Sequence, residues 1–320
     1  MRRFLTFSAR IAVSLALLYV ALRGINLVAI QSRLSQINLG WMGVGLSVAV
    51  LQCFIAALRW REISAQCSAR LTGPQAFRYN MIGAFFNQTL PSSIGGDAVR
   101  LWLVNRTGAG WRAATYSVLT DRAIGLIALA LIVVVSLPWS YFLITDAHGR
   151  LALLAVDALA LAGGLGFLLL GYLHWGRLKR WWPTRHLLAC SAIANHVMFG
   201  RNSAPKIAAT SLSVHILSVV IAWCAVRSIA VSANFVELFM LTPPVLLITM
   251  VPISIAGWGL REAAMMVAFG YAGLSQTEGT AVSLLFGAVY FTLGAIGGLV
   301  WIFSSEKTSE AIELAPAEDC

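Results

Sequence analysis

The sequence contains few charged residues. Asp, Glu, Lys and Arg make up 11% of its 320 residues, whereas hydrophobic residues make up 59%. An ordinary soluble domain is about half apolar and about a quarter charged. Too few polar side chains remain to cover a soluble domain of any size, so the composition predicts an all-α polytopic membrane protein.

The sequence also lacks the motifs of common catalytic and metal centres. It contains no HExxH, no DxxD and no glycine-rich phosphate loop, which are patterns that supply metal ligands or hold phosphates. The five cysteines are scattered without CxxC spacing, so we interpret them as small apolar residues of helices. We therefore predict a protein that is not an enzyme, with no catalytic residues, no metal and no cofactor.

Acidic residues are scarce, and they are unevenly placed. Lys and Arg number 23 against 13 acidic residues, which gives a net charge of +10. The basic residues stand between apolar runs, as in membrane proteins, so we expect no nucleic-acid partner. Five of the acidic residues lie in 306–320, which we predict to be a disordered cytoplasmic tail.

Six apolar runs are long enough to span a membrane, because a spanning helix needs about 20 residues. They cover residues 6–23, 39–58, 113–137, 151–173, 207–230 and 280–303. The first run resembles a signal peptide, but no cleavage site follows it, so we expect an uncleaved span. We predict one transmembrane domain over 1–305, whose halves 1–173 and 207–305 are joined by an interfacial segment, 174–206, rich in bases and tryptophans.

The basic residues predict the orientation of the chain. With both termini in the cytoplasm, sixteen of the 23 Lys and Arg residues lie on the inside and four on the outside. This bias agrees with the positive-inside rule and predicts a multi-pass protein of the bacterial inner membrane. On this topology Arg59 ends its span on the inside, Trp60 belongs to an interfacial aromatic belt, and Asp157 is solvated near the outer end of its span.

Two further apolar regions, 74–106 and 234–273, are interrupted by proline, glycine and charge. Residues 90–100 read LPSSIGGDAVR and residues 251–261 read VPISIAGWGLR, which share the pattern P-x-S-I-x-G-x-x-x-R. The topology makes the two regions enter from opposite faces, so we predict two broken or re-entrant helical hairpins in an inverted repeat. Whether they are re-entrant or cross twice stays open. The predicted helix-breaking residues are Pro91, Gly95, Gly96, Pro252 and Gly257.

The repeated motif also predicts a binding site. A broken helix starts again with free N–H groups, and the positive end of its dipole attracts anions. An arginine shortly after each break adds a full positive charge and a planar set of donors that fits a phosphate. We therefore predict that an anionic lipid headgroup binds near the two breaks. The candidate residues are Arg100, Arg261, Asn87, Ser93 and Ser254.

Four other charged residues near the motif are candidate charge partners or proton sites, because ionisable groups inside a membrane are costly. They are Asp97, Asp121, Arg122 and Glu262. Arg100 can pair with Asp97 three residues away, Arg261 can pair with Glu262 or Asp121, and Asn87 can bind freed backbone groups instead of a headgroup. Asp121 and Arg122 are adjacent in a helix, so they point to different sides.

Three stretches of the sequence resemble the lysylphosphatidylglycerol synthase transmembrane family, a flippase-like membrane domain. They are residues 87–100 (NQTLPSSIGGDAVR), 117–126 (SVLTDRAIGL) and 252–262 (PISIAGWGLRE). In fused members, the resemblance implies that this domain flips aminoacylated phosphatidylglycerol, which a separate cytosolic domain makes. Our chain ends at Cys320, soon after the last span, so we expect no aminoacyltransferase domain. Stand-alone members are implied to handle other lipids, including polyprenyl-phosphate-linked sugars.

We predict that the chain translocates an anionic phospholipid or a polyprenyl-phosphate-linked lipid across the inner membrane. An intramembrane lipid-phosphate transferase that uses Asp97 and Asp121 is an alternative, and so is a non-transporting scaffold of a lipid or envelope synthesis complex. The predicted partners are membrane lipids, with a second copy of the chain or a lipid-synthesis enzyme left open.

Overall fold

The computed structural model describes residues 35, 37–90, 95–172, 182–250 and 259–304, and within them the chain is helical and contains no β-strand. Five helical segments are long and apolar enough to cross a membrane. They are α3 (Leu39–Gln66), Gly95–Leu143, which contains α6 (Gly110–Leu143), α7 (Ala147–Leu170), α9 (Ala204–Ser228) and α12 (Gln276–Phe303). These helices confirm the all-α polytopic prediction. The predicted span 6–23 and the tail 306–320 lie outside the described residues.

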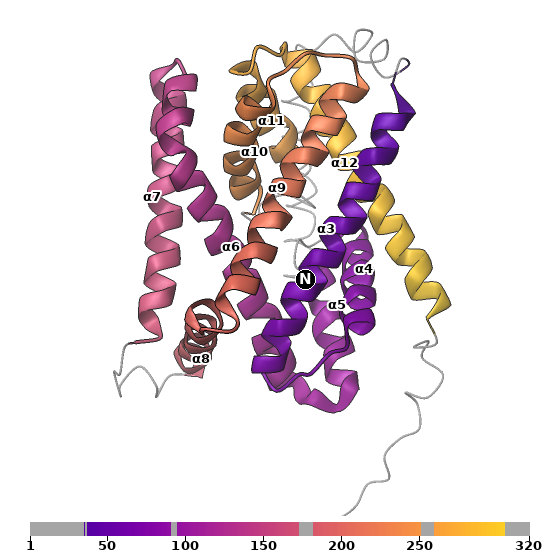
Figure 1. Ribbon diagram of the computed structural model, residues 1–320, viewed down its shortest axis with the longest axis vertical. Coiled ribbons are helices and arrows are strands. Elements are labelled where there is room, and N and C mark those ends of the chain that lie inside the picture. The colour runs from indigo at the N-terminus through magenta and orange to yellow at the C-terminus, as the bar shows by residue number, and fades with distance from the viewer. Residues whose placement is uncertain (1–34, 36, 91–94, 173–181, 251–258, 305–320) are drawn as a thin grey trace, which may run out of the picture.

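Each interrupted region forms a pair of short helices in contact with each other. The first pair is α4 (Gly73–Thr89) and α5 (Gly95–Val104), and the second is α10 (Phe235–Thr249) and α11 (Leu260–Gly270). At a rise of 1.5 Å per residue these helices are about 15–26 Å long, which is shorter than the roughly 30 Å hydrocarbon core of a bilayer. The two pairs lie toward opposite ends of the molecule (Figure 1).

The first pair is held together by a close backbone approach. The N–H of Gly96 donates to Asn87 Oδ1 at 2.9 Å, so Asn87 binds a backbone group freed by the helix break. A Cβ at position 96 would stand 2.1 Å from the carbonyl oxygen of Gly83, which only glycine avoids. Gly95 and Gly96 therefore allow α5 to pack directly on α4. The other predicted helix-breaking residues, Pro91, Pro252 and Gly257, lie outside the described residues.

Two connections complete the bundle. A π-helical turn, η1 (Asn105–Ala109), joins α5 to α6, and it contains Gly108 with a φ of 86°. The predicted interfacial segment 174–206 contains α8 (Trp182–Phe199), which packs against α6, α7 and α9. Its bases and tryptophans at 174–181 lie outside the described residues.

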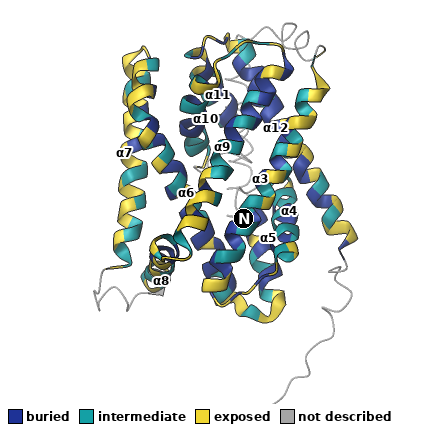
Figure 2. Ribbon diagram, in the orientation of Figure 1, coloured by how far each residue is buried: buried dark blue, intermediate teal, exposed yellow. Residues whose placement is uncertain are grey.

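Helix α3 lies at the centre of the fold and packs against α4, α6, α9 and α12. Helix α7 stands at the edge of the bundle, and most of its residues are exposed or half-buried (Figure 2). Its only buried residues are Leu153 and Asp157. The interior face of α3 therefore meets segments from both halves of the sequence, and this is where the buried charges gather.

Candidate functional site

A buried carboxylate on α6 joins three helices. Asp121 Oδ1 accepts from Arg59 Nε on α3 at 3.0 Å, and Asp121 Oδ2 accepts from Arg100 Nη2 on α5 at 3.0 Å. All three side chains are at most 8% exposed. An ion pair buried in this way requires both partners, because either charge alone would be left without solvent or counter-ion.

A second carboxylate, that of Asp97, links Arg100 to the more exposed Arg122. Asp97 Oδ1 accepts from Arg100 Nη1 at 3.1 Å, and the two Asp97 oxygens accept from Arg122 Nη2 at 3.0 Å and Arg122 Nε at 2.7 Å. The Arg122 side chain is 42% exposed. We call these five residues, Arg59, Asp97, Arg100, Asp121 and Arg122, the central charge cluster. Three guanidinium groups face two carboxylates, so the cluster carries one surplus positive charge.

Neutral side chains enclose the cluster. The Arg100 guanidinium carbon lies 3.9 Å from the ring centre of Trp60, which is fully buried, in the geometry of a cation–π contact. Ser211 on α9 accepts from Arg59 Nη1 at 3.4 Å. The arginines of the interior are therefore already engaged, and Arg122 is the cation of this cluster that a ligand can reach.

The second pair of short helices contains a similar but smaller group, the Glu262 cluster, formed by Gly259, Arg261, Glu262 and Ser283. Glu262 is fully buried, and its Oε1 accepts from Arg261 Nη2 at 2.7 Å and from Ser283 Oγ at 3.2 Å. Its Oε2 accepts from the N–H of Gly259 at 2.5 Å. Gly259 has a φ of 85°, which favours glycine. It is the residue immediately before α11.

The two clusters repeat one local arrangement. In each, an arginine near the start of the second short helix contacts a residue on the following long helix. Arg100 reaches Asp121, 21 residues later, and Arg261 reaches Ser283, 22 residues later, at 3.4 Å from Nε to Oγ. Each arginine also faces an aromatic ring, Trp60 for Arg100 and Phe286 for Arg261. The arginine that ends the shared sequence motif therefore makes similar contacts in the two places.

A polar contact on α3 lies between the two clusters. Gln52 Nε2 donates to Ser218 Oγ on α9 at 2.6 Å, and Gln52 Oε1 accepts from Tyr290 on α12 at 2.8 Å. Gln52 and Tyr290 each stand two helical turns, about 10.5 Å, from a residue of one cluster, and Ser218 stands as far from Ser211, which accepts from Arg59. The pairs are Gln52 and Arg59 on α3, Ser218 and Ser211 on α9, and Tyr290 and Ser283 on α12. A group of polar side chains thus lies in the apolar interior, two helical turns from the contacts of either cluster.

The structure places the sequence-predicted residues in two separate groups. Arg100, Asp97, Asp121 and Arg122 belong to one cluster, and Arg261 and Glu262 to the other. Of the alternatives for Arg261, Glu262 is its partner, because Asp121 pairs with Arg59 and Arg100. Asp121 is buried and Arg122 is half-exposed, as their adjacency predicts. Ser93 and Ser254 lie outside the described residues.

Three sequence expectations are wrong. Arg59 is buried in the central charge cluster and is not exposed at the end of its span, and Trp60 is buried against Arg100 and not part of an interfacial belt. Both follow from the length of α3, which continues to Gln66. Asp157 is 2% exposed, and neither of its carboxylate oxygens has a hydrogen-bond partner among the described residues. Helix α7 begins at Ala147, four residues before the predicted span, which places Asp157 near the middle of the helix.

Comparison with known proteins places the chain in a family. The family model of the lysylphosphatidylglycerol synthase TM region matches residues 7–298. No curated protein and no solved structure matches the chain. The family match covers most of the sequence, including both pairs of short helices, so the chain belongs to this family, and the resemblance of its three motifs is confirmed.

Proposed function

We propose that this member of the lysylphosphatidylglycerol synthase transmembrane family translocates a lipid with an anionic headgroup, which binds at Arg122 of the central charge cluster. The observation that carries the proposal is a buried cluster with one surplus cation, whose outermost arginine, Arg122, has a side chain that is 42% exposed. Ionised groups inside a membrane are costly and tend to mark the paths of substrates. A phosphate is the natural partner of a guanidinium, whose donors match its oxygens in pairs.

Binding at Arg122 requires an exchange of partners. Asp97 holds Arg122 through two hydrogen bonds and holds Arg100 through a third. A headgroup phosphate can replace Asp97 on Arg122 while Asp97 keeps its contact with Arg100. The Asp97 carboxylate thus neutralises Arg122 when no lipid is bound. The headgroup is released when Asp97 binds Arg122 again.

The repeated clusters support movement rather than storage of the lipid. The two pairs of short helices lie toward opposite ends of the molecule (Figure 1), and the polar contacts of Gln52 with α9 and α12 lie two helical turns from the contacts of either cluster. In this proposal the breaks enter the inner membrane from opposite faces, with both termini cytoplasmic, as in transporters built from inverted repeats. The substrate is an anionic phospholipid or a polyprenyl-phosphate-linked lipid.

The same contacts favour a transporter over a transferase. A general base needs a carboxylate that is free to take a proton from the substrate. Asp97 and Asp121, the two acids that a transferase would use, each accept from two arginines. In our proposal the chain therefore performs no covalent step.

We expect Arg122→Gln to slow the movement of a fluorescent anionic lipid about 10- to 100-fold, because a hydrogen bond to a charged group contributes roughly 1.5–3 kcal/mol. The fold should persist, because the charges of the two remaining arginines and the two aspartates of the cluster balance. Movement is measured in proteoliposomes with a quencher that reaches only the outer leaflet. Arg201→Gln, which changes an exposed arginine between α8 and α9, is the matched control.

Equal rates for wild type and Arg122→Gln would refute the headgroup site. If the wild-type protein moves no lipid in this assay, the transport proposal fails and the scaffold alternative takes its place.

A further inference from the structure

Four carboxyl groups of the described residues are buried, and one of them differs from the others. Asp97, Asp121 and Glu262 each pair with an arginine. Asp157, near the middle of α7, is 2% exposed, and neither of its carboxylate oxygens has a hydrogen-bond partner in the described part of the chain. An ionised carboxylate in such surroundings is costly, whereas a neutral carboxyl is much less so. Asp157 is therefore a buried acid whose charge none of these residues balances.

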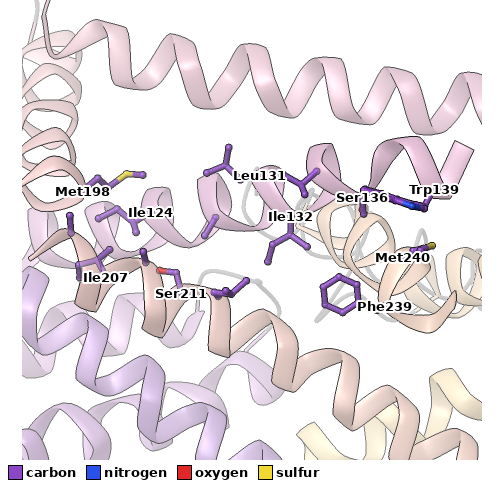
Figure 3. Close-up of a pocket in the computed structure, with 15 residues that line it drawn as sticks. Ile124, Leu131, Ile132, Ser136, Trp139, Met198, Ile207, Ser211, Phe239 and Met240 are labelled. Carbon is purple, nitrogen blue, oxygen red and sulfur yellow. The ribbon is translucent and has the colours of Figure 1, made fainter. Parts of the chain in front are cut away.

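The part of α6 at the level of Asp157 carries no charge. Helices α6 and α7 are joined by a three-residue connection and run antiparallel, and a Cβ at Gly164 would lie 3.6 Å from Ile127 Cγ1. Asp157 precedes Gly164 by two helical turns, which places it level with about residue 134 of α6. Figure 3 shows this stretch of α6, residues 124–139, and none of its side chains is titratable.

The other helices that pack against α7 are α8 and α10. Helix α8 is hydrogen-bonded to the carbonyl oxygen of Phe167, about 15 Å along α7 from Asp157. On α10, the carbonyl oxygen of Met240 accepts from Ser140 of α6 at 3.3 Å, and Glu237 lies beyond it, further from the level of Asp157. The nearest titratable residues on these elements are Tyr141 on α6, Arg150 on α7, Cys190 on α8 and Glu237 on α10.

A cavity of about 340 Å³ between α6 and α7 lies between Asp157 and the exposed arginine of the central charge cluster. It is lined on α7 by Ala160, three residues after Asp157, and on α6 by Leu126, four residues after Arg122. Residues at these spacings share one face of a helix. Because the two helices run antiparallel, Asp157 and Arg122 stand at opposite ends of the cavity. A Cβ at Gly163, which also lines it, would meet no atom within 4 Å.

We propose that Asp157 is a proton-binding site of this protein, and that a proton bound there crosses the membrane together with the anionic lipid that Arg122 binds; the coupling rests on the proposed function. The carboxylate takes a proton from water on one side and releases it to water on the other, and no other bond changes. An ionised Asp157 would repel an anionic headgroup between α6 and α7. The headgroup therefore passes only while Asp157 is protonated.

Exchange of this proton with water requires that α7 move relative to α6. Helix α7 is suited to such a movement, because it stands at the edge of the bundle and most of its residues are exposed or half-buried (Figure 2). Its buried residues are Leu153 and Asp157. Little packing holds α7 in place, so a small displacement opens the cavity and brings water to the carboxyl.

The first measurement is infrared spectroscopy of the full chain at pH 7, in a detergent that contains no carbonyl group. Exposed carboxyl groups are ionised at this pH, so a protonated carboxyl gives a C=O stretching band of its own. We expect the band in the wild type and its loss in Asp157→Asn, whose amide keeps the shape of the protonated carboxyl. Asp146→Asn, at the exposed N-cap of the same helix, is the matched control and should keep the band.

The second measurement follows a fluorescent lipid with one negative charge in proteoliposomes that have a pH difference of one unit across the membrane. Movement of one proton with each lipid is electrically neutral, so the pH difference alone drives it. We expect the lipid to accumulate about 10-fold in the leaflet toward which protons flow, because one pH unit corresponds to about 1.4 kcal/mol. In Asp157→Asn the lipid should distribute evenly between the leaflets.

If Asp157→Asn does not fold, Asp157→Glu takes its place and should shift the infrared band without removing it, because the carboxyl is kept. A band that persists in Asp157→Asn, or no band in the wild type, would overturn the proton site. Equal accumulation in the wild type and in Asp157→Asn would also overturn the inference.

The two measurements separate this inference from the proposed function. Loss of the band in Asp157→Asn, in a protein that moves no lipid, would overturn the transport proposal and leave the proton site standing. Lipid movement that depends on Arg122 but does not respond to a pH difference would overturn the coupling to Asp157 and leave the proposed function standing.

Discussion

Asp121→Ala is expected to destabilise the folded protein by about 3–5 kcal/mol, the usual cost of breaking a buried ion pair by removing one partner. Asp121 is the carboxylate that Arg59 and Arg100 share, and both guanidinium groups are at most 8% exposed. Without Asp121, the hydrogen bonds that remain among the described residues are the long one from Arg59 to Ser211 and the one from Arg100 to Asp97. The loss is measured as a shift of thermal unfolding in detergent.

The control for Asp121 is an ion pair of the same chemistry outside the interior. Arg61 and Glu62 on α3 pair at 2.8 Å, with side chains that are 41% and 32% exposed. Exposed pairs of this kind contribute about 0–1 kcal/mol, so Glu62→Ala should change unfolding little. If Asp121→Ala and Glu62→Ala shift the unfolding temperature equally, Asp121 does not contribute the stability expected of a buried ion pair.

Glu262→Ala is expected to have the second largest effect, also about 3–5 kcal/mol. Glu262 is fully buried, and Arg261, its partner, is 7% exposed. The substitution removes the counter-ion of a buried guanidinium, the acceptor of the Gly259 N–H and the acceptor of the Ser283 hydroxyl. Glu262→Gln keeps the size of the side chain and one acceptor oxygen but loses the charge and the other acceptor, so its unfolding temperature should lie between those of wild type and Glu262→Ala.

Glu278 provides a control with the same local geometry. Its carboxylate accepts from the N–H of Ser275 at the start of α12, as the carboxylate of Glu262 accepts from the N–H of Gly259 at the start of α11. Loss of a helix cap costs about 1 kcal/mol, and Glu278 is half-buried whereas Glu262 is fully buried. A Glu262→Ala variant that is no less stable than Glu278→Ala would show that the pairing with Arg261 contributes nothing.

The helices and their breaks could be predicted from the sequence because they depend on local composition. Long apolar runs give spans, and proline and glycine interrupt them. The opposite exposure of Asp121 and Arg122 follows from helix geometry alone. The pairing of Arg100 with Asp97 and of Arg261 with Glu262 follows from positions close in the chain.

The residues that sequence reasoning missed depend on contacts between distant segments. Arg59 is buried because it meets Asp121, 62 residues away, and no periodicity reveals such a partner. The apolar run of α3 ends near residue 58, but the helix continues to Gln66. Arg59 and Trp60 were therefore predicted at the end of the span, whereas they are buried within the helix. Asp157 was predicted too close to a helix end for the same reason, because α7 begins before its apolar run begins. The signal that would have identified Arg59 and Asp157 as buried is a charged residue near the edge of an apolar run.

The most direct test of the proposed function compares headgroups on the wild-type protein. Lipids with identical tails and either a phosphate-bearing anionic or a zwitterionic headgroup are reconstituted separately, and their movement between leaflets is followed. Because the cluster has one surplus cation at Arg122, we expect the anionic lipid to move at least about 10-fold faster, which corresponds to about 1.4 kcal/mol. Equal rates for the two lipids, or no movement of either, would contradict the proposal that this protein translocates an anionic lipid.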